Sequence, residues 1–206
     1  MTRKNMIPSS IVTIIPIFIG LVIWNSLPDT MAVHFDLNGV PNGYASKAMV
    51  VFGMPIFLLA INLLLIFVTE REDKDKDISK KMLKVLIWIC PFISCIVVGS
   101  IFLNALKYNV NIPMIAMFII AILEIAIGNY LPKCRKNSVV GIRVPWTMEC
   151  DTNWNRTHRF AGNIYFFSGV ITFILIFFTE YFGVVLFLNL IAVLSPIFYS
   201  FLIRNK

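Results

Sequence analysis

The sequence has 206 residues, of which 58% are hydrophobic and 14% are charged, and its formal net charge at pH 7 is +7. Its mean hydropathy of +0.82 lies far from the ordinary balance of a globular protein. This composition excludes a soluble globular domain and predicts a protein that lies within a membrane.

Six apolar segments are long enough to cross a bilayer, which takes about 20 helical residues. They cover residues 7–24, 48–68, 82–103, 112–131, 161–178 and 183–203. Backbone amides in lipid must be satisfied within their own segment, and these segments show no strand-like alternation. We therefore expect an all-α fold, a polytopic bundle of six transmembrane helices that forms one integral-membrane domain over residues 1–206.

The distribution of basic residues predicts the orientation of this bundle. Of the 18 Lys and Arg residues, 16 fall at the two chain ends or in the loops at residues 69–81 and 132–160 and their immediate borders. Because positive loops stay in the cytoplasm, both termini and these two loops should be cytoplasmic. The loop at residues 25–47 should lie outside. The net charge then reflects topology and interaction with membrane lipid, and it predicts no nucleic-acid partner.

The outer loop has the period of an extended strand with one apolar face. The alternating residues are Val33, Phe35 and Leu37 on one side and His34, Asp36 and Asn38 on the other. We expect a short hairpin-like cap whose apolar face, including Leu37, lies on the helices.

Two Asn-Gly pairs, Asn38-Gly39 and Asn42-Gly43, are turn signals in this loop because both residue types tolerate positive φ. His34 and Asp36 would then share the face that points away from the helices. They either solvate and pin the loop or contact an external peptide, and the sequence leaves both interpretations open.

The inner loop contains a predicted extended stretch at residues 137–144, turned by Gly141 and ended by Pro145. Trp146 suits the membrane interface. Arg143 stands between these turn residues, which favours a structural or partner-binding role over simple solvation.

A helix that runs into the fifth span should follow, with Asp151 or Thr152 as its N-cap. Trp154 and His158 share one face of this helix with Ala161. Arg156 and Arg159 lie off that face, where they could anchor at the membrane surface or reach lipid phosphates or acidic partners.

Glu124 is the only acidic residue within the predicted spans. An intramembrane carboxyl is expensive and suggests a function by default. Its candidate hydrogen-bond partners are Asn62, Asn129 and Asn189. Glu124 either joins helices as a neutral acid or takes part in a proton- or cation-coupled step.

Enzyme chemistry has little support in this sequence. Metal sites need clusters of His, Cys and carboxylates, yet His34 and His158 are the only histidines and are predicted on opposite sides of the membrane. No hydrolase, metalloprotease or phosphate-binding motif occurs. We predict no catalytic residues, no metal and no cofactor, and a protein that is not an enzyme.

The polar motifs resemble those of the SdpI family, bacterial integral-membrane immunity proteins that act against a secreted antimicrobial peptide. The motifs are Leu-Pro-Asp at 27–29, His-Phe-Asp-x-x-Gly at 34–39, Gly-Ile-Arg-x-Pro-Trp-Thr at 141–147 and Trp-x-x-Thr-His-Arg at 154–159. The resemblance implies a multi-pass protein of the bacterial plasma membrane that gives immunity by binding an extracellular peptide toxin.

Two other functions stay open: a receptor that tethers a cytoplasmic regulator protein, and a small proton-coupled transporter. The motifs supply the candidate residues for binding the toxin or a partner, which are His34, Asp36, Gly39, Arg143, Pro145, Trp146, Trp154, His158 and Arg159.

Overall fold

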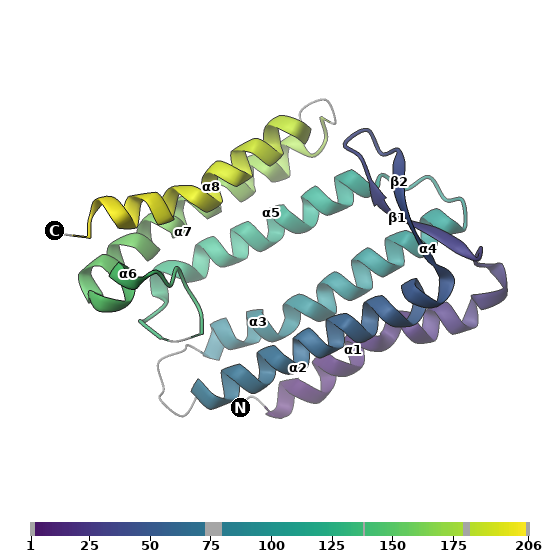
Figure 1. Ribbon diagram of the computed structural model, residues 1–206, viewed down its shortest axis with the longest axis horizontal. Helices are drawn as coiled ribbons and strands as arrows, with labels where there is room; N and C mark the ends of the chain where they lie inside the picture. Colours follow the sequence, from purple (N-terminus) through teal and green to yellow (C-terminus); the bar gives the residue numbers. More distant parts are fainter. Residues whose placement is uncertain (1–2, 73–79, 138, 179–181, 205–206) are drawn as a thin grey trace. The chain divides into compact units, whose positions relative to one another are not determined.

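The computed structural model describes residues 3–72, 80–137, 139–178 and 182–204, and it is mainly helical (Figure 1). The chain divides into two compact units, residues 1–70 with 83–116 and residues 71–82 with 117–206. The single integral-membrane domain stays a prediction.

The first unit combines kinked helices with a β-hairpin. Its elements are α1 (Arg3–Val22), η1 (Trp24–Ser26), β1 (Thr30–Phe35), β2 (Pro41–Ser46), η2 (Met49–Gly53), α2 (Met54–Glu72), α3 (Lys80–Ile93), η4 (Ser94–Val98) and α4 (Gly99–Ala105). Both η2 and η4 are π-helical turns that continue into the next α-helix. The core of this unit lies where the hairpin meets the helices, and its buried members are Leu27, Met31, Val50, Val51, Val98, Ile101 and Phe102.

The second unit contains the polar loop, which we define as residues 134–150. Its elements are α5 (Ile112–Tyr130), η5 (Leu131–Lys133), α6 (Pro145–Glu149), α7 (Asp151–Leu175) and α8 (Phe182–Leu202). α7 and α8 pack along each other as a helical pair (Figure 1). The predicted extended stretch before Pro145 is irregular loop in its described residues.

Four helical stretches among the described residues are long and apolar enough to cross a membrane. They are Met49–Thr69, Met82–Ala105, Ile112–Lys133 and Phe182–Leu202, and they confirm four of the six expected segments. The first expected segment corresponds to a shorter apolar helix, Met6–Val22. The fifth lies within α7, whose first turns are polar. The complete set of six spans stays a prediction.

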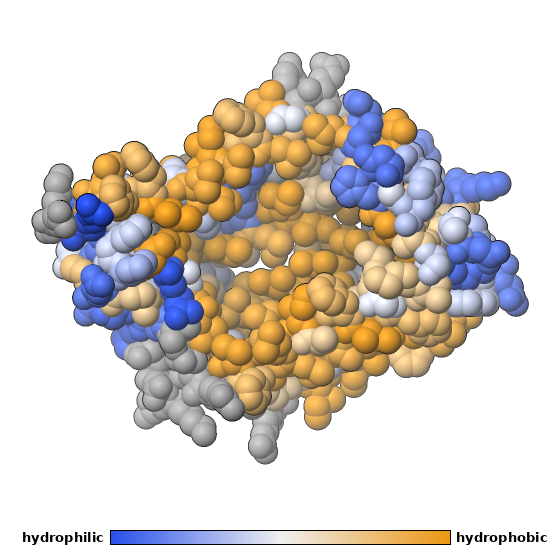
Figure 2. Space-filling view, in the orientation of Figure 1, coloured by the Kyte–Doolittle hydropathy of each residue, from blue (hydrophilic) through white to orange (hydrophobic). Residues whose placement is uncertain are grey.

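The helices of each unit carry apolar side chains on their outer surfaces, such as Val22 at 85% exposure and Phe198 at 66% (Figure 2). Hydrophilic residues gather instead on the hairpin and on the polar loop (Figure 2). Extended apolar surface of this kind is unfavourable in water but is expected where lipid surrounds a helix.

Prolines within the helices leave carbonyl groups that neighbouring side chains satisfy. Pro16 has no N–H for the Val12 carbonyl, and the Cys95 thiol donates to that oxygen over 3.4 Å. On the next residue, the Ser94 hydroxyl donates to the Thr13 carbonyl over 2.7 Å. These contacts explain how a kinked helix avoids unpaired backbone groups in an apolar environment.

The hairpin pairs β1 with β2 in antiparallel register, with Met31 opposite Ala45 and His34 opposite Gly43. Val33 of the expected apolar face is partly buried and packs against the core cluster, to which the earlier strand residue Met31 belongs. The expectation for Leu37 is wrong, because β1 ends at Phe35 and Leu37 is 45% exposed. A turn starts at Asp36 and redirects the chain before the alternation reaches Leu37.

Of the two predicted turns, the one at Asn38-Gly39 is confirmed, with Gly39 at φ +80°. The turn at Asn42-Gly43 is wrong, because both residues belong to β2. Gly43 is needed there for a different reason. A Cβ atom on Gly43 would lie 2.9 Å from the Cβ of His34 across the strands.

Candidate functional site

The base of the hairpin is anchored by Lys47, a residue that motif reasoning missed. Its Nζ lies 3.3 Å from the Trp24 carbonyl, 3.4 Å from the Asp29 carboxylate and 5.1 Å from the centre of the Trp24 ring. The Lys47 backbone N–H also donates to the Asp29 carbonyl over 2.8 Å. Lys47 is the one basic residue in the predicted outer loop, a signal that could have identified it.

These contacts give the Leu-Pro-Asp motif a structural meaning. Leu27 is 3% exposed and belongs to the core cluster of the first unit. Two residues later, Asp29 meets Lys47 at the end of β2. The motif therefore holds the start of the hairpin in place, with Leu27 in the core and Asp29 paired with Lys47.

Asp36 organises the tip of the hairpin. Its Oδ1 accepts the backbone N–H groups of Asn38 over 2.9 Å and Val40 over 2.8 Å. Its own N–H donates to the Val40 carbonyl over 2.9 Å. A short carboxylate that bonds nearby backbone in this way stabilises a turn. Of the two interpretations of Asp36, this geometry favours pinning of the loop.

His34 presents a different environment on the same hairpin. It is exposed, and its Nδ1 lies 2.5 Å from Oδ1 of Asn42 on the opposite strand. Tyr44 follows two residues beyond Asn42 on β2, next to Gly43, which pairs with His34. Tyr44 is 66% exposed. We define His34, Asn42 and Tyr44 as the hairpin face.

Two predicted site residues of the polar loop region, Trp154 and His158, are buried at 0% and 1% exposure. Their rings stack with centroids 3.9 Å apart. The indole Nε1 of Trp154 donates to the Cys134 carbonyl over 2.9 Å, which holds the start of the loop. The shared face that the sequence predicts for these residues is confirmed, and the structure places both inside the unit.

His158 has both ring nitrogens engaged. Nε2 accepts the backbone N–H of Ile142 over 3.0 Å, so the proton of the neutral ring lies on Nδ1, which donates to the Trp154 carbonyl over 2.8 Å. Burial lowers the pKa of the His158 imidazole, and the bond to the Trp154 carbonyl acts in the opposite direction. The arrangement requires a neutral histidine.

Gly141 allows the loop to reach this ring pair. Its φ is +125°, as the predicted turn requires, and a Cβ atom there would lie 2.3 Å from Nε2 of His158 and 2.8 Å from Cη2 of Trp154. The Gly-Ile-Arg motif therefore begins with the residue that lies against the stacked rings.

Arg143 extends from a turn whose backbone is fixed on both sides. The Thr147 hydroxyl donates to the Ile142 carbonyl over 2.7 Å and lies 3.1 Å from the Val144 N–H, which donates to it. The Arg143 side chain is exposed. Its backbone is thus structural, while its guanidinium is available to a partner or to lipid phosphate.

Pro145 and Trp146, the next motif residues, begin α6 and attach it to α8. Pro145 occupies the first turn of α6, and Trp146 donates from Nε1 to the Ser200 hydroxyl of α8 over 2.8 Å. The Trp146 ring also meets Phe201 edge to face at 5.4 Å. Asn153 Nδ2 reinforces the same junction by donating to the Ser200 carbonyl over 3.0 Å.

The predicted N-cap of the following helix is wrong by one residue. Cys150 occupies the cap position with extended backbone, and Asp151 lies in the first turn, where it pairs with Lys136. The backbone N–H groups of Asn153 and Thr152 lower the pKa of the exposed Cys150 thiol. The side chains of Arg156 and Arg159 are exposed, as the sequence predicts.

Glu124 is 8% exposed, and its Oε2 has no hydrogen-bond partner among the described residues. The three asparagines expected as partners bond elsewhere. Asn62 donates to Ser9 and Thr13, Asn129 accepts from Lys133, and Asn189 bonds within the α7–α8 pair.

No three His, Cys, Asp or Glu side chains gather into a metal-binding group within the described part of the chain. The polar features of the described residues are the hairpin face in the first unit, and the exposed arginines around the loop and one buried carboxyl in the second.

Two family models match this chain. Residues 133–200 match the SdpI/YfhL protein family, and residues 11–59 match a domain of unknown function, DUF1648. A curated relative, "Immunity protein SdpI" of Bacillus subtilis (strain 168), is 29% identical over 182 residues, which cover 86% of this chain and 83% of the relative. No solved structure matches. Together with the apolar helices, these matches identify a multi-pass plasma-membrane protein, and they confirm the predicted resemblance to the SdpI family.

Proposed function

We propose that this protein protects its cell from an externally acting antimicrobial peptide by binding the peptide at the hairpin face, without catalysis. The observation that carries the proposal is the contrast within the hairpin. Lys47 and Asp36 fix its base and its tip, whereas the side chains of His34, Asn42 and Tyr44 are exposed. A rigid strand pair with exposed polar and aromatic side chains is suited to recognition.

The immunity role comes from the relative, whose printed name is an immunity protein. The hairpin is assigned to it because a toxin that arrives from outside meets the outer loop first. This assignment depends on the topology predicted by the basic residues, with six spans and both termini in the cytoplasm.

Cysteine labelling tests that topology on the native protein. Cys150 is exposed, whereas Cys90 is buried and Cys95 and Cys134 are partly buried. We expect a membrane-impermeant maleimide to label Cys150 only after the cells are permeabilised. In a Cys150→Ser background, Asn38→Cys at the hairpin tip should be labelled in intact cells. Labelling of Cys150 in intact cells would contradict the proposed orientation.

The functional test is survival of a peptide-sensitive cell that expresses the protein. We expect His34→Ala and Tyr44→Ala to reduce survival while membrane abundance stays within about twofold of wild type, because exposed side chains contribute little to stability. Thr30→Ala, at another exposed position of β1, is the matched control and should protect fully. Full protection by both hairpin-face variants would reject this face as the binding site.

A second candidate function is tethering of a cytoplasmic regulator protein, favoured by Arg143 and its rigid exposed turn. Arg143, Arg156 and Arg159 would contact an acidic partner. In that case Arg143→Ala should leave abundance unchanged and release a soluble protein from the membrane fraction. The third candidate, a small proton-coupled transporter, would use Glu124, and its activity should collapse with the proton gradient.

A further inference from the structure

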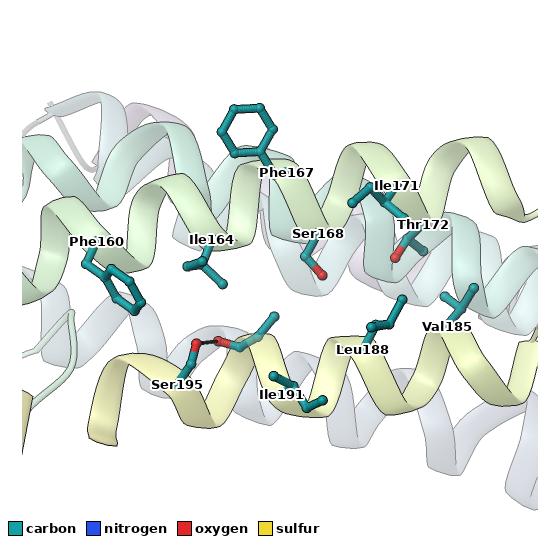
Figure 3. Close-up of a pocket in the computed structure, with 11 residues that line it drawn as sticks. Phe160, Ile164, Phe167, Ser168, Ile171, Thr172, Val185, Leu188, Ile191 and Ser195 are labelled. Atoms are coloured by element: carbon teal, nitrogen blue, oxygen red, sulfur yellow. Dashed lines mark hydrogen bonds between the residues drawn. The ribbon is translucent and has the colours of Figure 1, made fainter. Parts of the chain in front are cut away.

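A cavity of about 300 Å³ lies between α7 and α8 (Figure 3). Its lining residues on α7 recur at the spacing of one helix face, and they are Phe160, Ile164, Phe167, Ser168, Ile171 and Thr172. On α8 the lining includes Leu188 and Ile191, which are also exposed at 41% and 48%. The cavity therefore opens onto the apolar outer surface of the helix pair.

The three hydroxyl groups in the cavity wall are already bonded within the helix pair. The Ser168 hydroxyl lies 3.4 Å from Oδ1 of Asn189, and the Asn189 amide donates to the Thr172 hydroxyl over 3.0 Å. The Ser195 hydroxyl donates to the Ala192 carbonyl over 3.2 Å. A polar ligand would leave its own groups unpaired against the remaining apolar wall. A cavity of about 150 Å³ with such walls stays dry and binds apolar molecules, so this larger one suits a hydrocarbon.

A free basic side chain lies at one end of the cavity. Arg156 is one helical turn before Phe160, on the same side of α7 as the lining residues. Its side chain is exposed, and it forms no ion pair with an acidic side chain of the described residues. The Phe160 ring stacks on that of Tyr199 with centroids 4.4 Å apart, which closes the cavity between α7 and α8 at this end. An unpaired guanidinium beside an apolar cavity is complementary to a molecule with an anionic head and a hydrocarbon tail.

Distances along α7 match the dimensions of one membrane leaflet. The axial rise from Arg156 to Phe160 is about 6 Å. The headgroup region on each side of a bilayer is about 5–8 Å thick. The rise from Phe160 to Thr172 is about 18 Å, and the hydrocarbon of one leaflet measures about 15 Å. A lipid whose phosphate lies at Arg156 would therefore place an acyl chain along the cavity.

We propose that α7 and α8 form a binding site for an anionic phospholipid, with its phosphate at Arg156 and one acyl chain in the cavity. The membrane around this multi-pass protein supplies the ligand, and α8 is one of the helices long enough to cross it. The predicted topology places Arg156 on the cytoplasmic side, where anionic lipids attract basic side chains. The proposal does not depend on peptide binding at the hairpin.

Native mass spectrometry of the detergent-purified protein tests the headgroup contact. The probes are phosphatidylglycerol and phosphatidylcholine with identical acyl chains, and glycerol phosphate as a headgroup without a chain. We expect wild type to prefer phosphatidylglycerol and to retain no glycerol phosphate. Arg156→Ala should reduce the preference about fivefold, the usual effect of one basic side chain at an anionic surface. Arg204→Ala is the matched control and should keep the preference, because its guanidinium lies over Phe201, which does not line the cavity.

A second pair of variants tests the cavity. Leu188→Trp should fill it and weaken the binding of both lipids, whereas Leu190→Trp, exposed on the same helix but outside the lining, should not. Should Leu188→Trp fail to fold, Ile191→Phe enlarges the same wall by less and takes its place. Unchanged lipid binding in a folded cavity variant would overturn the proposal, and so would equal affinity of wild type for the two lipids. Dimer masses that the cavity variant abolishes would assign the cavity to a second copy of the chain instead.

Discussion

The backbone N–H of Ile142 donates to Nε2 of His158 over 3.0 Å, across 16 residues of sequence. This bond ties the turn that carries Arg143 to the first part of α7, and it forms only while Nε2 is unprotonated. Protonation would place an N–H opposite an N–H in a buried site. The polar loop therefore depends on the ionisation state of one histidine.

The first prediction concerns this pH dependence. Because the folded-state pKa of His158 is lowered, mainly by burial, the unfolded chain binds more protons just below the ordinary histidine pKa of about 6.5. The stability contributed by neutral His158 is fully present above that value and is lost as the pH falls through the lower folded-state pKa.

Thermal unfolding in detergent between about pH 5 and pH 8 should show this decline, since stability follows the difference in bound protons. His158→Gln, which cannot titrate, should have a lower midpoint at neutral pH and a flatter dependence below it. An equally steep decline in that variant would assign the effect to other groups.

A second prediction concerns Gly141. Gly141→Ala should lower the free energy of unfolding by at least about 1–3 kcal/mol, the usual cost of a strained backbone, with the contact against His158 in addition. Membrane abundance and thermal unfolding would both fall. Gly99→Ala is the control, since a Cβ atom on Gly99 would meet no neighbouring side chain within 4 Å among the described residues. Its abundance should stay near that of wild type.

The third prediction concerns the base of the hairpin. Lys47→Ala removes the contacts to the Trp24 carbonyl and ring, so the hairpin should become more susceptible to protease in intact cells and protection should decrease. Asp29→Asn should have a much smaller effect, because the Asp29 side chain is fully exposed and its ion pair is screened by water. Equal sensitivity of the two variants would assign the anchor to the ion pair instead.

A fourth prediction separates the surface of the polar loop from its interior. Trp154→Ala should reduce stability by about 3–5 kcal/mol and lower membrane abundance, because a large buried ring is lost. Arg143→Ala should keep normal abundance, since its side chain is exposed. The sequence alone suggested that both variants lose abundance or fail to recruit a partner. Immunoblots of membrane fractions beside survival distinguish them, and a depleted Arg143→Ala would restore the structural role.

Asp36→Ala gives a fifth prediction. It removes the acceptor for two backbone N–H groups at the hairpin tip, where a lost cap typically costs about 1 kcal/mol. We expect reduced protection through a disordered tip, with recovery in Asp36→Asn, which retains an acceptor oxygen. If Asp36→Asn is as defective as Asp36→Ala, the charge itself takes part in recognition.

Hydropathy located the helices well because a membrane helix corresponds to a local run of apolar residues. Turn chemistry located Gly39 for the same reason, since a positive φ is a local property. Periodicity also placed Trp154 and His158 on one face. In each case the decisive information lies within a few neighbouring residues.

Other features depend on partners distant in sequence and could not be predicted in this way. Asn42-Gly43 is locally a good turn, yet β2 runs through it, and Gly43 pairs there with His34 on β1, which lies outside the turn signal. The residues near Lys47 in the sequence do not indicate that its ammonium group bonds to the Trp24 carbonyl, 23 residues earlier. Ser168 is one serine among many until α8 is placed beside it.

α1 and α8 differ in what their prolines permit. At Pro196 the carbonyl of Ala192 is covered by Ser195, from the same helix, over 3.2 Å (Figure 3). At Pro16 the donors belong to another element, because Cys95 and Ser94 come from η4. Because donor and acceptor belong to the same helix, α8 can bend at Pro196 and keep this hydrogen bond. A change of the bend at Pro16 would instead separate the Val12 carbonyl from its donor on η4, so α1 is held at this point by another element.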